Sequence, residues 1–216
     1  MSLTLYIPNR RRFLQHLMFS GAALAAPGAF AAALQQTPAQ TEGPFYPNHL
    51  PLDTDNDLLI INNELTRAVG EVSYVGGRVL DSRGDPIRNA VVEIWQCDQN
   101  GAYLHTQTGN RTRRDPNFQG YGRFLTDTQG RYYFRTIRPV AYPGRTPHIH
   151  LKVATGSGVL LTSQFYIAGE PQNERDGLYR AASRDPAQRA RIDMKLEPAN
   201  GLEVGALATS MDIVVA

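Results

Sequence analysis

The sequence predicts an all-β fold, a single β-sandwich of about eight short strands preceded by an extended N-terminal arm. Short runs of β-branched and aromatic residues recur along residues 71–216, as in Val91–Trp95. Turn-forming residues separate these runs, and the chain contains 19 glycines and 14 prolines. The 216 residues, 42% of them hydrophobic, suffice for one domain with its own core. The pattern shows neither a repeat nor a second domain.

Residues 1–33 have the features of an export signal. Arg10, Arg11 and Arg12 form a basic segment, and residues 17–33 are apolar, alanine-rich and end in small-x-small cleavage sites. The order Arg-Arg-x-Phe-Leu-Gln over residues 10–15 resembles the bacterial twin-arginine signal. We therefore expect a periplasmic or secreted protein with no stable membrane insertion after processing. An ordinary Sec signal and a retained membrane anchor are the alternatives.

Removal of residues 1–33 changes the charge of the chain. This segment holds three arginines and no acidic residue, so its loss takes the formal net charge from +2 to −1. No basic run remains to indicate a nucleic-acid partner. The single cysteine, Cys97, cannot form an internal disulfide, and we expect it in a core strand rather than as a catalytic thiol.

Residues 34–70 are predicted to form the extended arm, because they are polar and rich in proline, asparagine and aspartate. Phe45 and Tyr46 are aromatic residues in this polar surrounding, so we expect both to be anchored. Either they pack on the surface of their own domain or they line a pocket, that of this chain or of a neighbouring subunit. A homo-oligomer joined through the arm is therefore one expectation.

The predicted sandwich, residues 71–216, follows the arm. Gly76 and Gly77 suggest a bulge or a close backbone approach. Residues 104–120 are expected to form a surface loop, and Asp185 to cap a short helix ending at Arg189. The turn Asp127–Gly130 is predicted to join a hairpin. The expected strands are Val72–Leu80, Val91–Trp95, Arg123–Thr126, Arg131–Ile137, a strand from His148 to Val153, Val159–Ile167, Met194–Leu196 and Asp212–Val215.

His148 and His150 begin one of these strands and point to the same face, because side chains alternate along a strand. Their Cα atoms are expected to lie roughly 6–7 Å apart, so both imidazoles can reach one metal ion. Prolines and a glycine bend the preceding loop, which can bring Tyr142 back over the pair. Tyr103 ends a separate strand and turn. From these residues alone, cross-strand packing or surface exposure of the two histidines is favoured over a metal site.

Two ordered signatures resemble the intradiol ring-cleavage dioxygenase family, in an exported short form of the protocatechuate type. The resemblance runs from Thr41 to the strand that carries Gln164. Its motifs are Gly77-Arg78-Val79, Gly84, Val91–Gln96, Gly101-Ala102-Tyr103, Tyr142–His150 and Gln164-Phe165-Tyr166. Members of this family are non-haem iron(III) oxidoreductases that incorporate both atoms of O2.

The resemblance implies a ligand set for Fe(III). Tyr103, Tyr142, His148 and His150 match its two tyrosinate and two imidazole ligands, which a solvent hydroxide would complete. Tyr142 resembles the axial tyrosinate that dissociates when substrate binds, and His150 the axial histidine. Phenolate oxygens are hard anionic donors, which favour a hard trivalent ion.

The resemblance also implies the reaction and its pocket. A catechol-type ring would be opened by O2 between its two hydroxylated carbons, giving a cis,cis-muconate-type diacid. Arg145 matches an arginine over the bound ring, Gln164 a polar pocket residue, and the arm residues Thr41, Gly43 and Pro44 a pocket-forming segment. The ring substituents stay open, because the link between Tyr142 and His148 is short and lacks the tryptophan of the protocatechuate enzyme.

Two other functions compete with this interpretation. The segment Gly77–Trp95 also resembles prealbumin-type β-sandwiches, so a non-catalytic binding module of an exported protein is the alternative. A zinc hydrolase would use the same histidines, but no carboxylate lies near them in a hydrolase motif.

Overall fold

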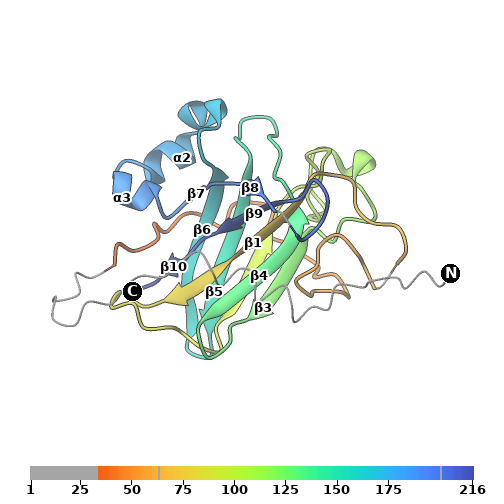
Figure 1. Ribbon diagram of the computed structural model, residues 1–216. Helices are drawn as coiled ribbons and strands as arrows, with labels where there is room; N and C mark the ends of the chain where they lie inside the picture. Colours follow the sequence, from red (N-terminus) through yellow and green to blue (C-terminus); the bar gives the residue numbers. More distant parts are fainter. Residues whose placement is uncertain (1–33, 63, 200) are drawn as a thin grey trace. The chain divides into compact units, whose positions relative to one another are not determined.

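Two five-stranded sheets stack against each other in the computed structural model, with short helices at one end (Figure 1). The structure describes residues 34–62, 64–199 and 201–216. The expected export signal, residues 1–33, lies outside the described residues. The all-β prediction is confirmed.

The first sheet is built around β1 (Val72–Leu80). This strand pairs antiparallel with β4 (Arg131–Ile137) and parallel with β9 (Leu207–Ser210) and β10 (Ile213–Val214). The strand β8 (Glu197–Pro198) adds to β9. At Gly77 a Cβ atom would lie 2.0 Å from the Met211 carbonyl oxygen, so the expected close backbone approach is present.

The second sheet carries the candidate site. Its order is β3 (Tyr121–Leu125), β2 (Val91–Trp95), β5 (His148–Thr155), β6 (Gly158–Ile167) and β7 (Asp193–Met194). The first four strands are antiparallel, and β7 pairs parallel with the end of β6.

Side chains alternate between the two faces of this second sheet. Ile149 and Leu151 of β5 and Ile94 of β2 are fully buried and contribute to the apolar core. His148 and His150 are also buried, yet they lie on the opposite face of β5. The functional side chains therefore lie on the face of the sheet that the arm and the long loops cover.

The predicted hairpin between β3 and β4 is wrong. The turn forms, with the Gly130 N–H donating to the Asp127 carbonyl at 3.0 Å. However, β3 pairs along its length with β2 in the second sheet, while β4 pairs with β1 in the first. The turn thus carries the chain from one sheet to the other instead of joining two neighbouring strands.

The region after β6 contains more helix than expected. The structure has a 3₁₀ helix η3 (Pro171–Arg175), α2 (Gly177–Ala182) and α3 (Pro186–Arg189). The cap predicted for α3 is confirmed, since the Asp185 carboxylate accepts the Ala187 N–H at 2.8 Å. Residues 104–120 form the expected loop, which contains the 3₁₀ turn η2 (Arg111–Arg113). None of the helices among the described residues is long and apolar enough to cross a membrane.

The arm runs along its own sandwich without forming a strand in its described part. Thr37 N–H donates to Val214 O at 2.9 Å, and Gln40 N–H donates to Thr162 O at 2.8 Å, so the arm touches both sheets. Leu58 is fully buried. Phe45 and Tyr46 are anchored within this chain, because they pack against the buried cluster of Trp95, Cys97, Tyr103 and Tyr121. A homo-oligomer joined through the arm stays a prediction.

Candidate metal centre

Cross-strand register gathers polar and aromatic residues on the covered face of the second sheet. The pairs of facing residues are Trp95–Tyr121, Trp95–His150, His150–Gln164 and His148–Tyr166. Because facing residues in antiparallel strands have neighbouring side chains, four strands contribute to one site.

Three donor atoms from two elements converge at the centre of this face. The Nε2 atoms of His148 and His150 lie 3.1 Å apart, and the Tyr103 hydroxyl lies 3.2 Å from His148 Nε2. All three side chains are almost fully buried. The strand β5 supplies both histidines, and the segment after β2 supplies the tyrosine. The sequence-predicted ligands Tyr103, His148 and His150 are thus brought together.

Tyr142 reaches the same place through a tight turn. The Arg145 N–H donates to the Tyr142 carbonyl at 2.9 Å, and Gly144 between them has φ +83°, a value that favours glycine. The Tyr142 ring centroid lies 5.5 Å from those of both Tyr103 and His148. Tyr142 is only half-buried. It therefore forms the outer edge of the site.

Burial keeps both imidazoles neutral. Desolvation and the nearby Arg145 charge lower the pKa of His148 to about 4, and burial together with His148 lowers the pKa of His150 well below its usual range. The His148 Nδ1–H donates to the Thr146 carbonyl, 2.6 Å away, which leaves Nε2 with its lone pair toward the centre. Neutral imidazoles oriented in this way are suited to bind a metal ion.

The two phenols complete a donor set that fits iron(III). Burial raises the pKa of Tyr103 well above its usual value and raises that of Tyr142, whose neighbour Arg145 opposes the change. Only a strong Lewis acid would hold both as phenolates at neutral pH. Among the described residues, no cluster of three or more His, Cys, Asp and Glu side chains could hold a metal. The two histidines are instead accompanied by two tyrosines, whose phenolate oxygens are hard donors suited to a hard trivalent ion.

Arg145 extends from the same turn toward β6. Its Nε donates to Asp176 Oδ2 at 2.8 Å and its Nη2 donates to Gln164 Oε1 at 2.6 Å. Burial alone would lower the pKa of Arg145, but the hydrogen bond to Asp176 raises it, so the guanidinium is charged. Gln164 Nε2 in turn donates to the Thr41 carbonyl at 3.2 Å. The predicted pocket residues Arg145 and Gln164 are thus bonded to each other and to the arm.

The arm forms one wall of the site. Phe45 stacks on Tyr103 with ring centroids 4.9 Å apart, and Tyr46 contacts Trp95 edge-on at 5.0 Å. Gly43 lies against His150, since a Cβ atom at Gly43 would be 3.5 Å from His150 Cε1. Of the predicted arm residues, Thr41 contributes its carbonyl, Gly43 its close approach, and Pro44 is exposed at the start of a turn.

Comparison with known proteins agrees with this geometry. Residues 41–214 match the sequence model of the family described as dioxygenase. The chain is 37% identical over 173 residues to the protocatechuate 3,4-dioxygenase beta chain of Burkholderia cepacia. The aligned region covers 76% of this chain and 72% of that relative. The chain belongs to the intradiol ring-cleavage dioxygenase family. By this membership it is an enzyme of the dioxygenase class, an oxidoreductase.

Two further comparisons, one of sequence and one of structure, point the same way. The chain is 31% identical over 124 residues to catechol 1,2-dioxygenase from Candida albicans, a match that covers 49% of this chain and only 40% of that protein. A dioxygenase domain from a carbohydrate-binding fusion protein of Streptomyces sp. SirexAA-E has a similar structure, with a TM-score of 0.64 and 29% identity. That match covers 83% of this chain and 97% of the domain.

Three residues that hydrogen-bond to the candidate site were not among its predicted residues. Gln40 Oε1 accepts the Tyr166 hydroxyl at 2.6 Å, Tyr166 donates toward Gln164 Oε1 at 3.0 Å, and Asp176 holds Arg145. Tyr166 was detectable, because it lies two positions after Gln164 and so shares its face. For Gln40 and Asp176 the sequence carries no comparable signal.

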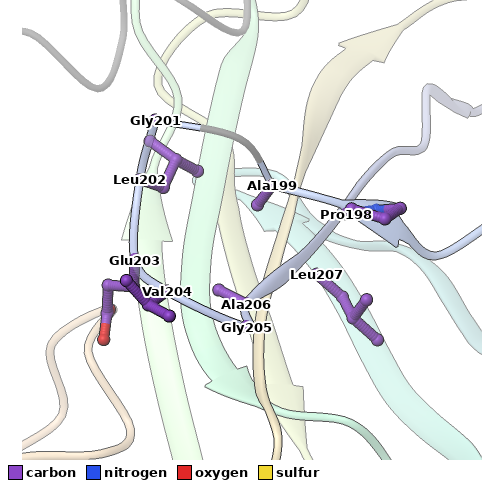
Figure 2. A pocket seen from close by; sticks show the side chains of 9 residues that line it. All are labelled: Pro198, Ala199, Gly201, Leu202, Glu203, Val204, Gly205, Ala206 and Leu207. Atoms are coloured by element: carbon purple, nitrogen blue, oxygen red, sulfur yellow. The ribbon is translucent and has the colours of Figure 1, made fainter.

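A surface pocket lies elsewhere, in the segment from β8 to β9 (Figure 2). The residues that line it are Pro198, Ala199 and 201–207, and Glu203 is the one ionisable side chain among them. It includes none of the residues of the candidate metal centre.

Proposed function

We propose that this dioxygenase opens a catechol-type ring between its two hydroxylated carbons with O2, giving a cis,cis-muconate-type diacid. The observation that carries the proposal is that His148 Nε2 lies within 3.2 Å of both the Tyr103 hydroxyl and His150 Nε2, beside a partly buried Arg145. Relatives named for protocatechuate and for catechol support the same general reaction.

Tyr103, Tyr142, His148 and His150 would hold iron(III) at this centre. When bound, the ion would supply the Lewis acidity that keeps the two phenols and the substrate hydroxyls ionised and would make the ring reactive toward O2. The neutral imidazoles and the covered position of Tyr103 suit permanent ligands.

Tyr142 is suited to take a proton from the substrate. A catechol must lose the protons of both hydroxyl groups to become a chelating dianion. The Tyr142 Oη, at the half-buried edge of the site, would accept one of them as a general base, and a solvent hydroxide would accept the other and leave as water. The adjacent Arg145 guanidinium favours the phenolate form of Tyr142 before that transfer.

Arg145 stabilises the negative charge that develops on the ring and the attacking oxygen. Its guanidinium is held at Nε by Asp176 and at Nη2 by Gln164, so it is fixed before the substrate arrives. Such a preorganised charge is most effective where water is excluded. The Phe45 ring over Tyr103 and the buried Trp95 under His150 exclude water from this face.

The test is oxygen uptake by the purified, iron-loaded protein with a panel of catechols that differ in ring substituents. We expect one iron per chain, a red-brown colour from tyrosinate-to-iron(III) charge transfer that shifts with catechol, and a diacid product. A protein that retains no iron after loading, stays colourless and consumes no O2 with any catechol would overturn the proposal and favour the binding module.

We also propose that the protein is exported by the twin-arginine route, as residues 10–15 suggest. Arg10→Lys with Arg11→Lys should leave the precursor in the cytoplasm, whereas Arg12→Lys should not. Cell fractionation measures both, and export of the double variant at the normal level would refute this route.

A further inference from the structure

We propose that Asp176 is a positioning residue, which fixes the direction of the Arg145 guanidinium and thereby the placement of its charge over the substrate. The proposal rests on the proposed function, because that function defines what Arg145 must do. Asp176 itself lies behind Arg145, between η3 and α2, and acts through it.

The two oxygen atoms of Asp176 are fully engaged in the structure. Oδ2 accepts Arg145 Nε at 2.8 Å and the Thr146 N–H at 3.0 Å. Oδ1 accepts the N–H groups of Leu178 and Tyr179 at 2.9 and 3.1 Å and so caps α2. The side chain of Asp176 is 1% exposed, against 16% for Arg145. A carboxylate with four donors in a buried place has little freedom to move.

This carboxylate and Gln164 hold Arg145 at two separate atoms. A guanidinium is planar, so bonds at Nε and at Nη2 fix the orientation of the whole plane. Gln164 alone would leave the plane free to rotate about a single bond. Burial alone would raise the pKa of Asp176, but the hydrogen bonds from Arg145 and from backbone N–H groups hold it below its usual range. The pair is therefore ionic at neutral pH.

The same segment also supports the residue that orients His148. Thr146 donates its N–H to Asp176 and its hydroxyl to Asn173 Oδ1 at 2.8 Å, while its carbonyl accepts the His148 Nδ1–H. Asp176 could thus influence the site through Arg145 or through His148. An effect through Arg145 changes turnover, whereas an effect through His148 changes metal retention, so the two routes are separable.

The experiment is a double-mutant cycle of Asp176→Asn and Arg145→Gln in the full-length protein. Asparagine has the shape of aspartate and still caps a helix, so α2 should persist. We expect Asp176→Asn to lower kcat by on the order of 10- to 100-fold, because a small misplacement of a catalytic group has effects of that size. In the Arg145→Gln background the same change should have almost no further effect, since the residue acts through Arg145.

The matched control is Asp185→Asn, which alters the corresponding cap of α3 at an exposed position. It should leave kcat unchanged. Iron per chain and the thermal midpoint are measured for every variant, and both should stay near the wild-type values for Asp176→Asn. Should that variant fail to fold, Asp176→Glu, which keeps the charge but moves it by one methylene, takes its place in the same cycle.

Three results would overturn the proposal. The first is that the losses in kcat from Asp176→Asn and Arg145→Gln add up in the double variant. The second is a wild-type kcat in a folded Asp176→Asn variant. The third is a loss of activity that is proportional to the loss of iron. Failure of the proposed function looks different, because the wild-type protein itself would then consume no O2 with any catechol.

Discussion

Trp95 stacks on His150, with the ring centroids 4.8 Å apart and an angle of 10° between the planes. The register of β2 and β5 places the two residues opposite each other. Both rings are buried, and His150 Nδ1 has no hydrogen-bond partner among the described residues. Because Nδ1 makes no hydrogen bond, packing against Trp95 orients that side of the His150 imidazole.

Trp95→Leu should weaken metal binding and lower stability, while the protein still folds. Loss of the stacked ring leaves a cavity and frees the imidazole, at a cost of about 2–4 kcal/mol in the free energy of unfolding. Iron per chain after dialysis against a chelator should fall, whereas Trp95→Phe should retain most of it. Because Trp95 is the single tryptophan in the sequence, unfolding is followed by circular dichroism. Full iron retention in Trp95→Leu would show that the stack is dispensable.

The fold was predictable where the pattern along one strand decides the structure. The ranges expected for β1, β2 and β4 agree with the structure, since runs such as Val91–Trp95 favour strands by themselves. The hairpin failed because a turn specifies only a local reversal, while pairing depends on distant sheet edges. The strand Leu207–Ser210 was missed because four residues with two small ones give no strong pattern.

The candidate site was likewise predictable where residues lie on one strand or in one motif. The period of two correctly placed His148 and His150 on one face, and the resemblance indicated Tyr103, Tyr142 and Arg145. Asp176 contacts Arg145 from 31 residues further along the chain. Its local sequence indicates a helix cap at most, so its second role depends on tertiary structure.

Phe45→Ala should open the wall that the arm forms. The ring stacks on Tyr103 and lies edge-on to Tyr142 at 6.2 Å, so its loss admits water beside two of the proposed ligands. We expect a loss of about 1–3 kcal/mol of stability and faster loss of iron. Leu52→Ala is the matched control, because Leu52 lies in the same arm and is fully exposed. Equal behaviour of the two variants would argue against a role of the arm in the site.

Glu203→Gln should destabilise the protein in a pH-dependent way. Arg135 binds Glu203 at 2.6 Å and Asp57 of the arm at 3.0 Å, which ties three segments together. Burial alone would raise the pKa of Glu203, but the Arg135 hydrogen bonds lower it below its usual 4.5. A lowered pKa means that the charged form adds stability above about pH 4.5, and that this is lost as pH falls through the folded-state pKa.

Urea unfolding across pH measures this effect. We expect Glu203→Gln to cost about 1–3 kcal/mol at pH 7. The difference from wild type should shrink below pH 4, where the wild-type carboxylate also becomes protonated. Glu197→Gln removes the same charge from an exposed position on β8 and should have a much smaller effect. A penalty for Glu203→Gln that does not vary with pH would mean that packing, not charge, holds this junction.

Tyr142→Phe and Tyr103→Phe should separate the roles of the two tyrosines. Tyr103 is 1% exposed and lies within 3.2 Å of His148 Nε2, whereas Tyr142 is half-buried at the edge. Loss of the Tyr103 hydroxyl should therefore abolish most iron binding. Loss of the Tyr142 hydroxyl should leave iron bound but slow catechol binding by roughly 10- to 1,000-fold, because the substrate then lacks a base for its proton.

Stopped-flow mixing with a catechol under anaerobic conditions follows this binding step through the change in colour. Metal analysis of the same samples shows whether iron is present. Normal turnover by Tyr142→Phe would mean that another group accepts the substrate proton, and the role assigned to Tyr142 would be wrong. Loss of iron from Tyr142→Phe as complete as from Tyr103→Phe would make both tyrosines permanent ligands, because neither could then be exchanged for a substrate oxygen.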